Sequence, residues 1–430
     1  MRLDEFLTSI RGGQLLVLGI LLLFPLSLRA QLFVDCSGTN PGVYPSINAA
    51  LQAATNGSTI LVTGPCNETV NLHGWNGLNL GAWYGKTATL NGALSISNSH
   101  NIFLYGLQIT NSPVDGVTVS DSTAVFLDSC TSSGNTLNGL RVQDMSDVGV
   151  LATGAFNNNG SSGIWSNINS LVVLNGWAGP VDVNDNVLDG IECEQATCVT
   201  FGNTNLRRNG ITGIDLVAGA KMEFAAYYGP NVVESNKSGG VSLRERSRMT
   251  ISTFNQQNII RGNGQVGVAV GFGSQLTLSG VQITNHASAG LDIYANSQAW
   301  LFGATTIQSS GNDTDARSAG ILVDGNSEAF LRGGDVSHNI GPGMLVLVNS
   351  SVDFAGVTAV GNSGGVIACD DTAIMVSDLS RAGLAPPAGI RCKTPHALGN
   401  RPIPNVAPNV PDLSPHKALH EKYRRLATRN

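Results

Sequence analysis

The chain has 430 residues, of which 52 are Gly, while 42% are hydrophobic and only 13% are charged. This much apolar material excludes a disordered polyelectrolyte, and the abundance of Gly argues against a long helical bundle. The formal net charge of −6 argues against a nucleic-acid-binding protein. A chain rich in Gly, Asn, Ser, Val and Ile favours short strands joined by tight turns.

Residues 1–30 are interpreted as a targeting segment. Arg2 and Arg11 precede an apolar run over residues 15–28, and Ala30 follows it. A run of about 14 residues is short for a bilayer span, which needs about 20, so the pattern predicts a signal peptide cleaved after Ala30. The alternative is an uncleaved N-terminal anchor. No later stretch could span a membrane, so we expect a secreted, extracellular or periplasmic protein.

The chain has seven cysteines, and export would permit disulfide bonds between them. We predict that Cys36 pairs with Cys66, Cys193 with Cys198, and Cys369 with Cys392, which leaves Cys130 as a buried thiol. None of these spacings is a metal-binding motif.

A repeat of one unit follows an N-terminal cap over residues 31–58. A Gly followed by an alternating apolar segment occurs eleven times from Gly116 to Gly365, at intervals of 22 to 30 residues. In most copies the residue before this Gly is small, polar or another Gly. This period is typical of a solenoid. Each unit contains short strand-like runs, such as residues 124–128 and 281–285, and no helical apolar stripe. We expect the repeat Gly to be a turn residue at positive φ.

These repeats resemble the right-handed parallel β-helix family, which has the pectin-lyase-like fold. In the segment from Tyr44 to Val62, the side chains of Ile47, Ala50, Leu51 and Ala54 fall on one helical face. This segment is similar to the short helix and first strand that open such proteins. The resemblance implies an all-β solenoid of about 13 coils over residues 59–392, with a short capping helix at its N-terminal end. It implies no particular activity, because the chain lacks the Gly-His-Gly and Asp-Pro-His-Asp motifs of enzymes with this fold.

Strand alternation predicts which side chains face outward. If the residue after each repeat Gly points into the core, the next one points out. One outer face then carries, on consecutive coils, Arg141, Trp165, Glu192, Glu194, Asp215 and Arg244. Neighbouring coils lie about 5 Å apart, so we expect these side chains to form one continuous row.

This row is the predicted functional site. The Trp165 ring suits the apolar face of a sugar, and the neighbouring acids suit its hydroxyl groups. Glu192 and Asp215 on adjacent strands would repel each other and raise one pKa, which is the arrangement that glycosidic cleavage needs. Glu192, Asp215 and Arg244 are therefore the catalytic candidates. Arg141 or Arg244 could instead bind a uronate carboxylate, and the alternative to any site is an ordinary solvated sheet face.

Long repeat intervals favour the same region as a binding surface. They contain Trp177 and the pair Tyr227 and Tyr228, which we predict to contact ligand together with Arg141, Trp165 and Glu194. The same intervals contain Asp182, Asp185 and Asp189, which could ligate Ca²⁺. No other cofactor is expected.

Residues 393–430 change in character. Five prolines between residues 395 and 411 predict an extended linker. The last 18 residues are basic, and we interpret them as a solvated tail or an attachment to an acidic partner. The sequence as a whole favours an exported protein that binds polysaccharide or a cell-surface partner without turnover. The alternative is a polysaccharide lyase or glycoside hydrolase acting on an acidic glycan.

Overall fold

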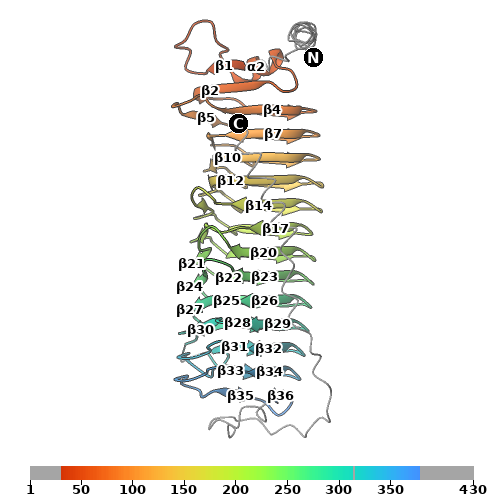
Figure 1. Ribbon diagram of the computed structural model, residues 1–430, viewed down its shortest axis with the longest axis vertical. Coiled ribbons are helices and arrows are strands. Elements are labelled where there is room, and N and C mark those ends of the chain that lie inside the picture. The colour runs from red at the N-terminus through yellow and green to blue at the C-terminus, as the bar shows by residue number, and fades with distance from the viewer. Residues whose placement is uncertain (1–30, 313–314, 378–430) are drawn as a thin grey trace, which may run out of the picture.

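The computed structural model describes residues 31–312 and 315–377, which form one continuous stack of about 14 coils (Figure 1). The predicted signal peptide, the partner predicted for Cys369 and the Pro-rich tail lie outside the described residues. Within the described part, the stack has one helix and two parallel sheets, so the expected all-β solenoid is confirmed.

The first strand of each repeat belongs to a sheet of 13 strands, called sheet B here. Its strands are β3 (Val70–His73), β6 (Leu94–Ser97), β9 (Val117–Ser120), β11 (Leu140–Gln143), β13 (Ile164–Asn167), β16 (Ile191–Glu194), β19 (Thr212–Val217), β22 (Gly239–Leu243), β25 (Val266–Val270), β28 (Ala289–Ile293), β31 (Ala319–Val323), β33 (Met344–Val346) and β35 (Ile367–Cys369).

The remaining strands form a sheet of 23 strands, called sheet A, to which most coils contribute two segments. They are β1 (Gln31–Asp35), β2 (Thr59–Cys66), β4 (Asn76–Ala82), β5 (Ala88–Asn91), β7 (His100–Tyr105), β8 (Leu107–Thr110), β10 (Thr123–Ser133), β12 (Asp147–Ala155), β14 (Leu171–Asn175), β15 (Val181–Asp182), β17 (Thr197–Thr200), β18 (Thr204–Arg207), β20 (Lys221–Ala226), β21 (Val232–Glu234), β23 (Arg248–Thr253), β24 (Asn258–Arg261), β26 (Gln275–Ser279), β27 (Val281–Thr284), β29 (Gln298–Phe302), β30 (Thr306–Gln308), β32 (Glu328–Arg332), β34 (Ser351–Ala355) and β36 (Ile374–Ser377).

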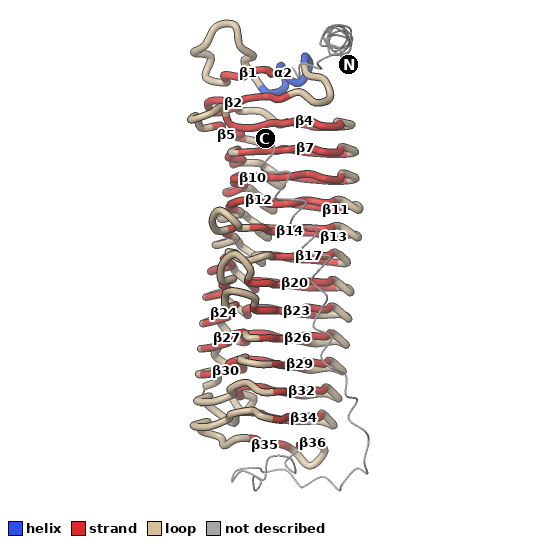
Figure 2. The backbone as a smooth tube through the Cα atoms, in the orientation of Figure 1, coloured by secondary structure: helices blue, strands red, loops and turns tan. Residues whose placement is uncertain are grey.

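The core lies inside the coils and is built from the predicted inward positions. These side chains are at most 1% exposed, and they are Val117, Leu140, Ile164, Ile191, Ile214, Val241, Val268, Leu291, Ile321 and Met344. The alternation of each strand thus places one apolar side chain above another along the whole stack. Helix α2 (Ile47–Ala53) closes one end (Figure 2), and its residues Ile47 and Ala50 are buried as expected.

The repeat glycines serve a purpose different from the one expected. From Gly116 to Gly343 they do not adopt positive φ. Instead, a Cβ atom would collide with the next coil: at Gly139 it would lie 2.7 Å from the side-chain nitrogen of Asn159 and from the carbonyl oxygen of Gly163. The close approach between coils therefore selects Gly here, and turn geometry does so only at other positions.

The cysteine pairs are confirmed where the structure describes both partners. Cys36 is bonded to Cys66, and Cys193 is bonded to Cys198. Cys130 is a buried free thiol, as expected, and burial raises its pKa to about 12. Cys392 lies outside the described residues. No helix in the described part is both long and apolar enough to cross a membrane.

Candidate functional site

The outer face of sheet B carries the predicted row, and its members lie in register. Arg141 is paired with Trp165, Trp165 with Glu192, and Glu192 with Asp215. Each step between strands is about 4.8 Å. Glu194 lies two residues beyond Glu192 on β16 and is therefore on the same face. The structure thus brings together the residues that strand alternation predicted.

Arg141 joins two neighbouring coils. Its guanidinium carbon lies 4.5 Å from the centroid of the Trp165 ring, within the range of a cation–π contact. Its Nη1 atom lies 3.6 Å from the buried carboxylate of Asp115 on the preceding coil. Arg141 is therefore held in place and its charge is already balanced.

Asp215 and Arg244 form the second fixed ion pair of the row. Arg244 directly follows β22, and its guanidinium group donates to both carboxylate oxygens of Asp215, with Nε 3.3 Å from Oδ1. The Asp215 residue is 6% exposed. Hydrogen bonding to Asp215 raises the pKa of Arg244. A buried carboxylate needs such a partner, because removing charge from water is costly.

Glu192 differs from Asp215 because it has no cationic partner among the described residues. Burial raises its pKa, and the nearby charges of Asp189, Asp215 and Glu194 raise it further. The Ser162 hydroxyl donates a hydrogen bond of 3.1 Å to Oε2 of Glu192, which acts in the opposite direction. Glu192 therefore keeps its proton to a higher pH than an exposed glutamate does.

A disulfide bond closes the turn that follows this part of the row. Cys193 in β16 and Cys198 in β17 point inward and are buried, and they are bonded to each other across the segment 194–197. Glu194 is the first residue of that segment. The covalent link therefore restrains the backbone on which Glu194 is carried.

The predicted aromatic contacts are not part of this face. Trp177 lies in the bend between β14 and β15, and the Tyr227–Tyr228 pair lies in the corresponding bend between β20 and β21. The ring centroids of these two tyrosines are 5.0 Å apart. A complete sheet A strand separates each bend from sheet B, because the extra residues were inserted after the second strand of the coil. These aromatic residues therefore lie outside the row, and their contact with a ligand stays a prediction.

The three aspartates considered as Ca²⁺ ligands each interact with a different protein partner. Asp182 accepts a hydrogen bond from Asn205, and Asp185 pairs with Arg208 at 2.7 Å. Asp189 accepts from the backbone and hydroxyl groups of Thr212. In the described part of the chain, the potential ligand atoms that lie close enough together to hold a metal ion belong to Cys36, Cys66 and Glu68. The two cysteines are already bonded to each other.

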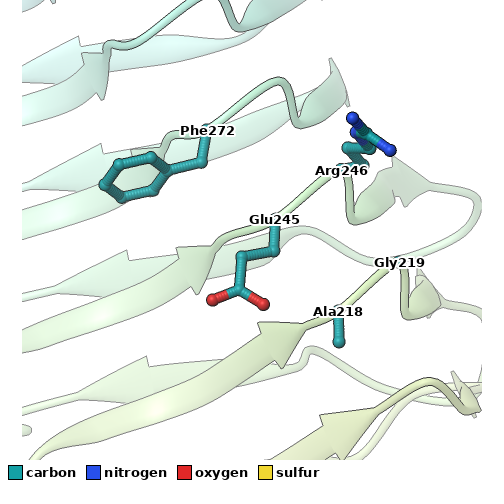
Figure 3. A pocket seen from close by; sticks show the side chains of 5 residues that line it. All are labelled: Ala218, Gly219, Glu245, Arg246 and Phe272. Carbon is teal, nitrogen blue, oxygen red and sulfur yellow. The ribbon is translucent and has the colours of Figure 1, made fainter.

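A pocket lies at the turns that follow β19, β22 and β25 (Figure 3). It is lined by Ala218, Gly219, Glu245, Arg246 and Phe272. Its non-glycine residues all have φ between 56° and 65°, a conformation that costs energy for residues with a side chain. Phe272 packs at 5.5 Å against Tyr294 of the next coil. The sequence does not predict this pocket, because Ala218, Glu245, Arg246 and Phe272 are not residue types that favour a left-handed conformation.

Residues 189–363 match the family described as a right-handed β-helix region. The chain has the right-handed parallel β-helix fold. No curated protein matches this β-helix protein in sequence.

Solved structures with low similarity to this β-helix protein include three carbohydrate-active enzymes. Pectate lyase Pel9A is 14% identical with a TM-score of 0.41, and the match covers 78% of each chain. The A-module of the mannuronan C-5 epimerase AlgE4 from Azotobacter vinelandii is 15% identical with a TM-score of 0.38, covering 75% of this chain and 91% of that one. The GH136 lacto-N-biosidase from Eubacterium ramulus is 8% identical with a TM-score of 0.31, covering 81% of this chain and 68% of that one.

Proposed function

We propose that this β-helix protein binds an extended polysaccharide, free or on a cell surface, along the sheet B row from Arg141 to Arg244, and that it does not cleave it. The observation that carries the proposal is the in-register stacking of Arg141, Trp165, Glu192 and Asp215. The row offers one outward side chain about every 4.8 Å along the stack, with one aromatic ring among hydrogen-bonding groups. Such a row suits a ligand that is itself a chain of repeating units.

Binding is favoured over turnover because both arginines of the row, and Asp215, are held in ion pairs. Arg141 is engaged by Asp115, and Arg244 by Asp215. Groups held in ion pairs orient a ligand well, whereas a proton-transferring acid or base must be free to exchange a proton with it. A site outside the cytosol agrees with the two disulfide bonds.

Affinity electrophoresis in native gels tests this proposal. Gels containing neutral glycans or polyuronides, with and without Ca²⁺, are compared with gels that contain no glycan. We expect at least one glycan to retard the protein, and Trp165→Ala to weaken this binding about 30-fold, because a central aromatic contact is worth about 2 kcal/mol.

The matched control is Trp300→Ala. Trp300 is an outward residue of sheet A that stacks on Phe330 with a centroid distance of 5.7 Å, so it lies away from the row. This variant should bind as the wild type does. Equal retardation of Trp165→Ala and wild type would refute binding at the row.

A second candidate function, glycoside hydrolysis, is favoured by the raised pKa of Glu192 beside the ion-paired Asp215. In that case Glu192 would donate a proton to the leaving oxygen and Asp215 would act opposite it, with Arg244 holding Asp215. The same glycan panel is read for new reducing ends and for unsaturated products. Hydrolysis predicts turnover that Glu192→Gln and Asp215→Asn abolish, and turnover that survives both changes and Arg244→Ala would exclude these residues.

A further inference from the structure

Four outward residues on two adjacent coils form a compact cluster within the row. On β13 and β16, Trp165 is in register with Glu192, and Asn167 is in register with Glu194. The two strands are about 4.8 Å apart, and residues two apart along a strand are separated by roughly 6.6 Å. The cluster therefore has the dimensions of about one sugar residue.

Asn167 supplies a hydrogen-bond acceptor without a partner. The residue is 8% exposed, and its side-chain oxygen makes no hydrogen bond. Leaving a buried polar atom unsatisfied costs about 1–3 kcal/mol. The oxygen is shielded from solvent in this conformation, so the amide must rotate to present it on the outer face, where an N–H or O–H group of a ligand beside Glu194 would remove this cost.

The cluster also has an excess of negative charge. The two nearby guanidinium groups are used by other carboxylates, Arg141 by Asp115 and Arg244 by Asp215. In the described part of the chain, no ion pair involves Glu192 or Glu194.

We propose that Trp165, Asn167, Glu192 and Glu194 form a subsite for the protonated amino group of a hexosamine residue, so that the bound polysaccharide is cationic. This inference rests on the proposed binding function. An ammonium group brings three donors and one positive charge, which matches one amide oxygen and two carboxylates. The Trp165 ring already attracts the Arg141 cation, and such a ring favours positive charge beside it.

Other ligand groups fit the cluster less well. A uronate would add negative charge next to Glu192 and Glu194, which is unfavourable. A bare divalent ion needs several oxygen atoms at close range. Among the described residues, the potential ligand atoms that lie close enough together to hold a metal ion are elsewhere, at Cys36, Cys66 and Glu68.

Calorimetric titration at pH ~6, where an amine is still protonated, tests the inference. The probes are β-1,4-linked glucosamine oligosaccharides, the same oligosaccharides after N-acetylation, and oligogalacturonate with and without Ca²⁺. We expect the free-amine form to bind at least tenfold more tightly than the acetylated form, and its binding to weaken with added salt. Glu194→Gln should reduce that ratio to nearly one.

The control for net charge is Glu328→Gln, which removes an outward carboxylate from sheet A and should leave the ratio unchanged. Asn167→Ser is a second variant, expected to lower free-amine binding, and thermal unfolding verifies that each variant folds. Equal binding of both forms, or tighter binding of oligogalacturonate, would overturn the inference, while Trp165-dependent binding would still support the proposed function. Absence of binding to every probe would overturn the inference, and retardation by the other glycans in native gels would then decide the proposed function.

Discussion

The carboxyl group of Asp292, on the outer face of sheet B, is shielded from water, and one of its oxygen atoms lacks a hydrogen-bond partner. Asp292 lies in β28, and the oxygen without a partner is Oδ1. Burial raises its pKa to about 6; the charge of Asp324 acts in the same direction and that of Arg317 opposes it. Arg317 is bonded to Asp324 at 2.8 Å. The carboxyl group of Asp292 therefore keeps its proton to a higher pH than an exposed aspartate does.

The free energy of unfolding should depend on pH through Asp292. Because its pKa is higher in the folded state than the ordinary value of 3.8, its contribution is complete below about pH 4 and is lost as the pH rises through about 6. Between these values, the wild type should lose on the order of 2 kcal/mol relative to Asp292→Asn. Urea unfolding of both proteins at several pH values measures this difference, and parallel pH profiles would contradict the assignment.

Residue type and alternation predicted where the row lies, but they could not predict how its members are satisfied. The positions of Arg141, Trp165, Glu192 and Asp215 follow from a period of two along each strand. The missing partner of Asn167 does not, because it depends on the side chains of neighbouring coils, whose sequence separation varies with the length of each loop.

At the scale of the elements, a ladder of buried amides holds the coils in register. Each asparagine side chain accepts a hydrogen bond from the backbone N–H of the equivalent residue in the preceding coil. Its members are Asn135, Asn159, Asn186, Asn209, Asn236 and Asn263. The same amides lie against the repeat glycines, which explains why a side chain is not tolerated there.

His286 takes the place of the next asparagine. Its Nδ1 atom accepts from the backbone N–H of Asn263 at 3.3 Å, and its Nε2 atom lies 3.2 Å from the carbonyl oxygen of Ile260. The residue is 2% exposed, and burial lowers its pKa to about 4. A protonated ring could no longer accept at Nδ1.

Substitution His286→Asn should therefore make the ladder resistant to acid. Since the folded-state pKa is below the ordinary value of 6.5, the wild type should lose stability as the pH falls from about 6.5 to 4. The expected loss relative to the variant is on the order of 3 kcal/mol, measured by urea unfolding. Substitution of the exposed His338 by Asn is the control and should not change the pH profile. A loss of equal size in both variants would argue against the ladder.

The sequence predicts the strands better than it predicts the bends that connect them. Apolar alternation predicted the first strand of each repeat, some of the sheet A strands and the inward core. The insertion carrying Trp177, in contrast, could belong to either bend of its coil. Both bends are rich in the same polar and small residues, so composition does not distinguish them. The sequence therefore does not indicate which bend carries Tyr227 and Tyr228.

At the scale of the whole molecule, helix α2 protects one end of the stack. Ala50 is fully buried, and α2 packs against β1 and β2. Without this cover the terminal coil would expose its apolar interior next to a strand edge, a combination that promotes association.

Substitution Ala50→Glu should displace the helix and cause self-association. A charge introduced at this buried position has no partner and costs several kcal/mol. Light scattering after size-exclusion chromatography should detect oligomers of Ala50→Glu. Ala53→Glu, which changes an exposed residue of the same helix, should remain as the wild type. A monomeric Ala50→Glu protein with unchanged stability would show that α2 is dispensable as a cap.

The parallel direction of every ladder among the described strands gives the stack two unlike ends. A polymer that lies along the coils meets Arg141 before Arg244 in one orientation and after it in the other. Because a sugar chain also has unlike ends, the two orientations are diastereomeric and differ in free energy. A glycan bound to this face would therefore point its reducing end toward one particular end of the stack.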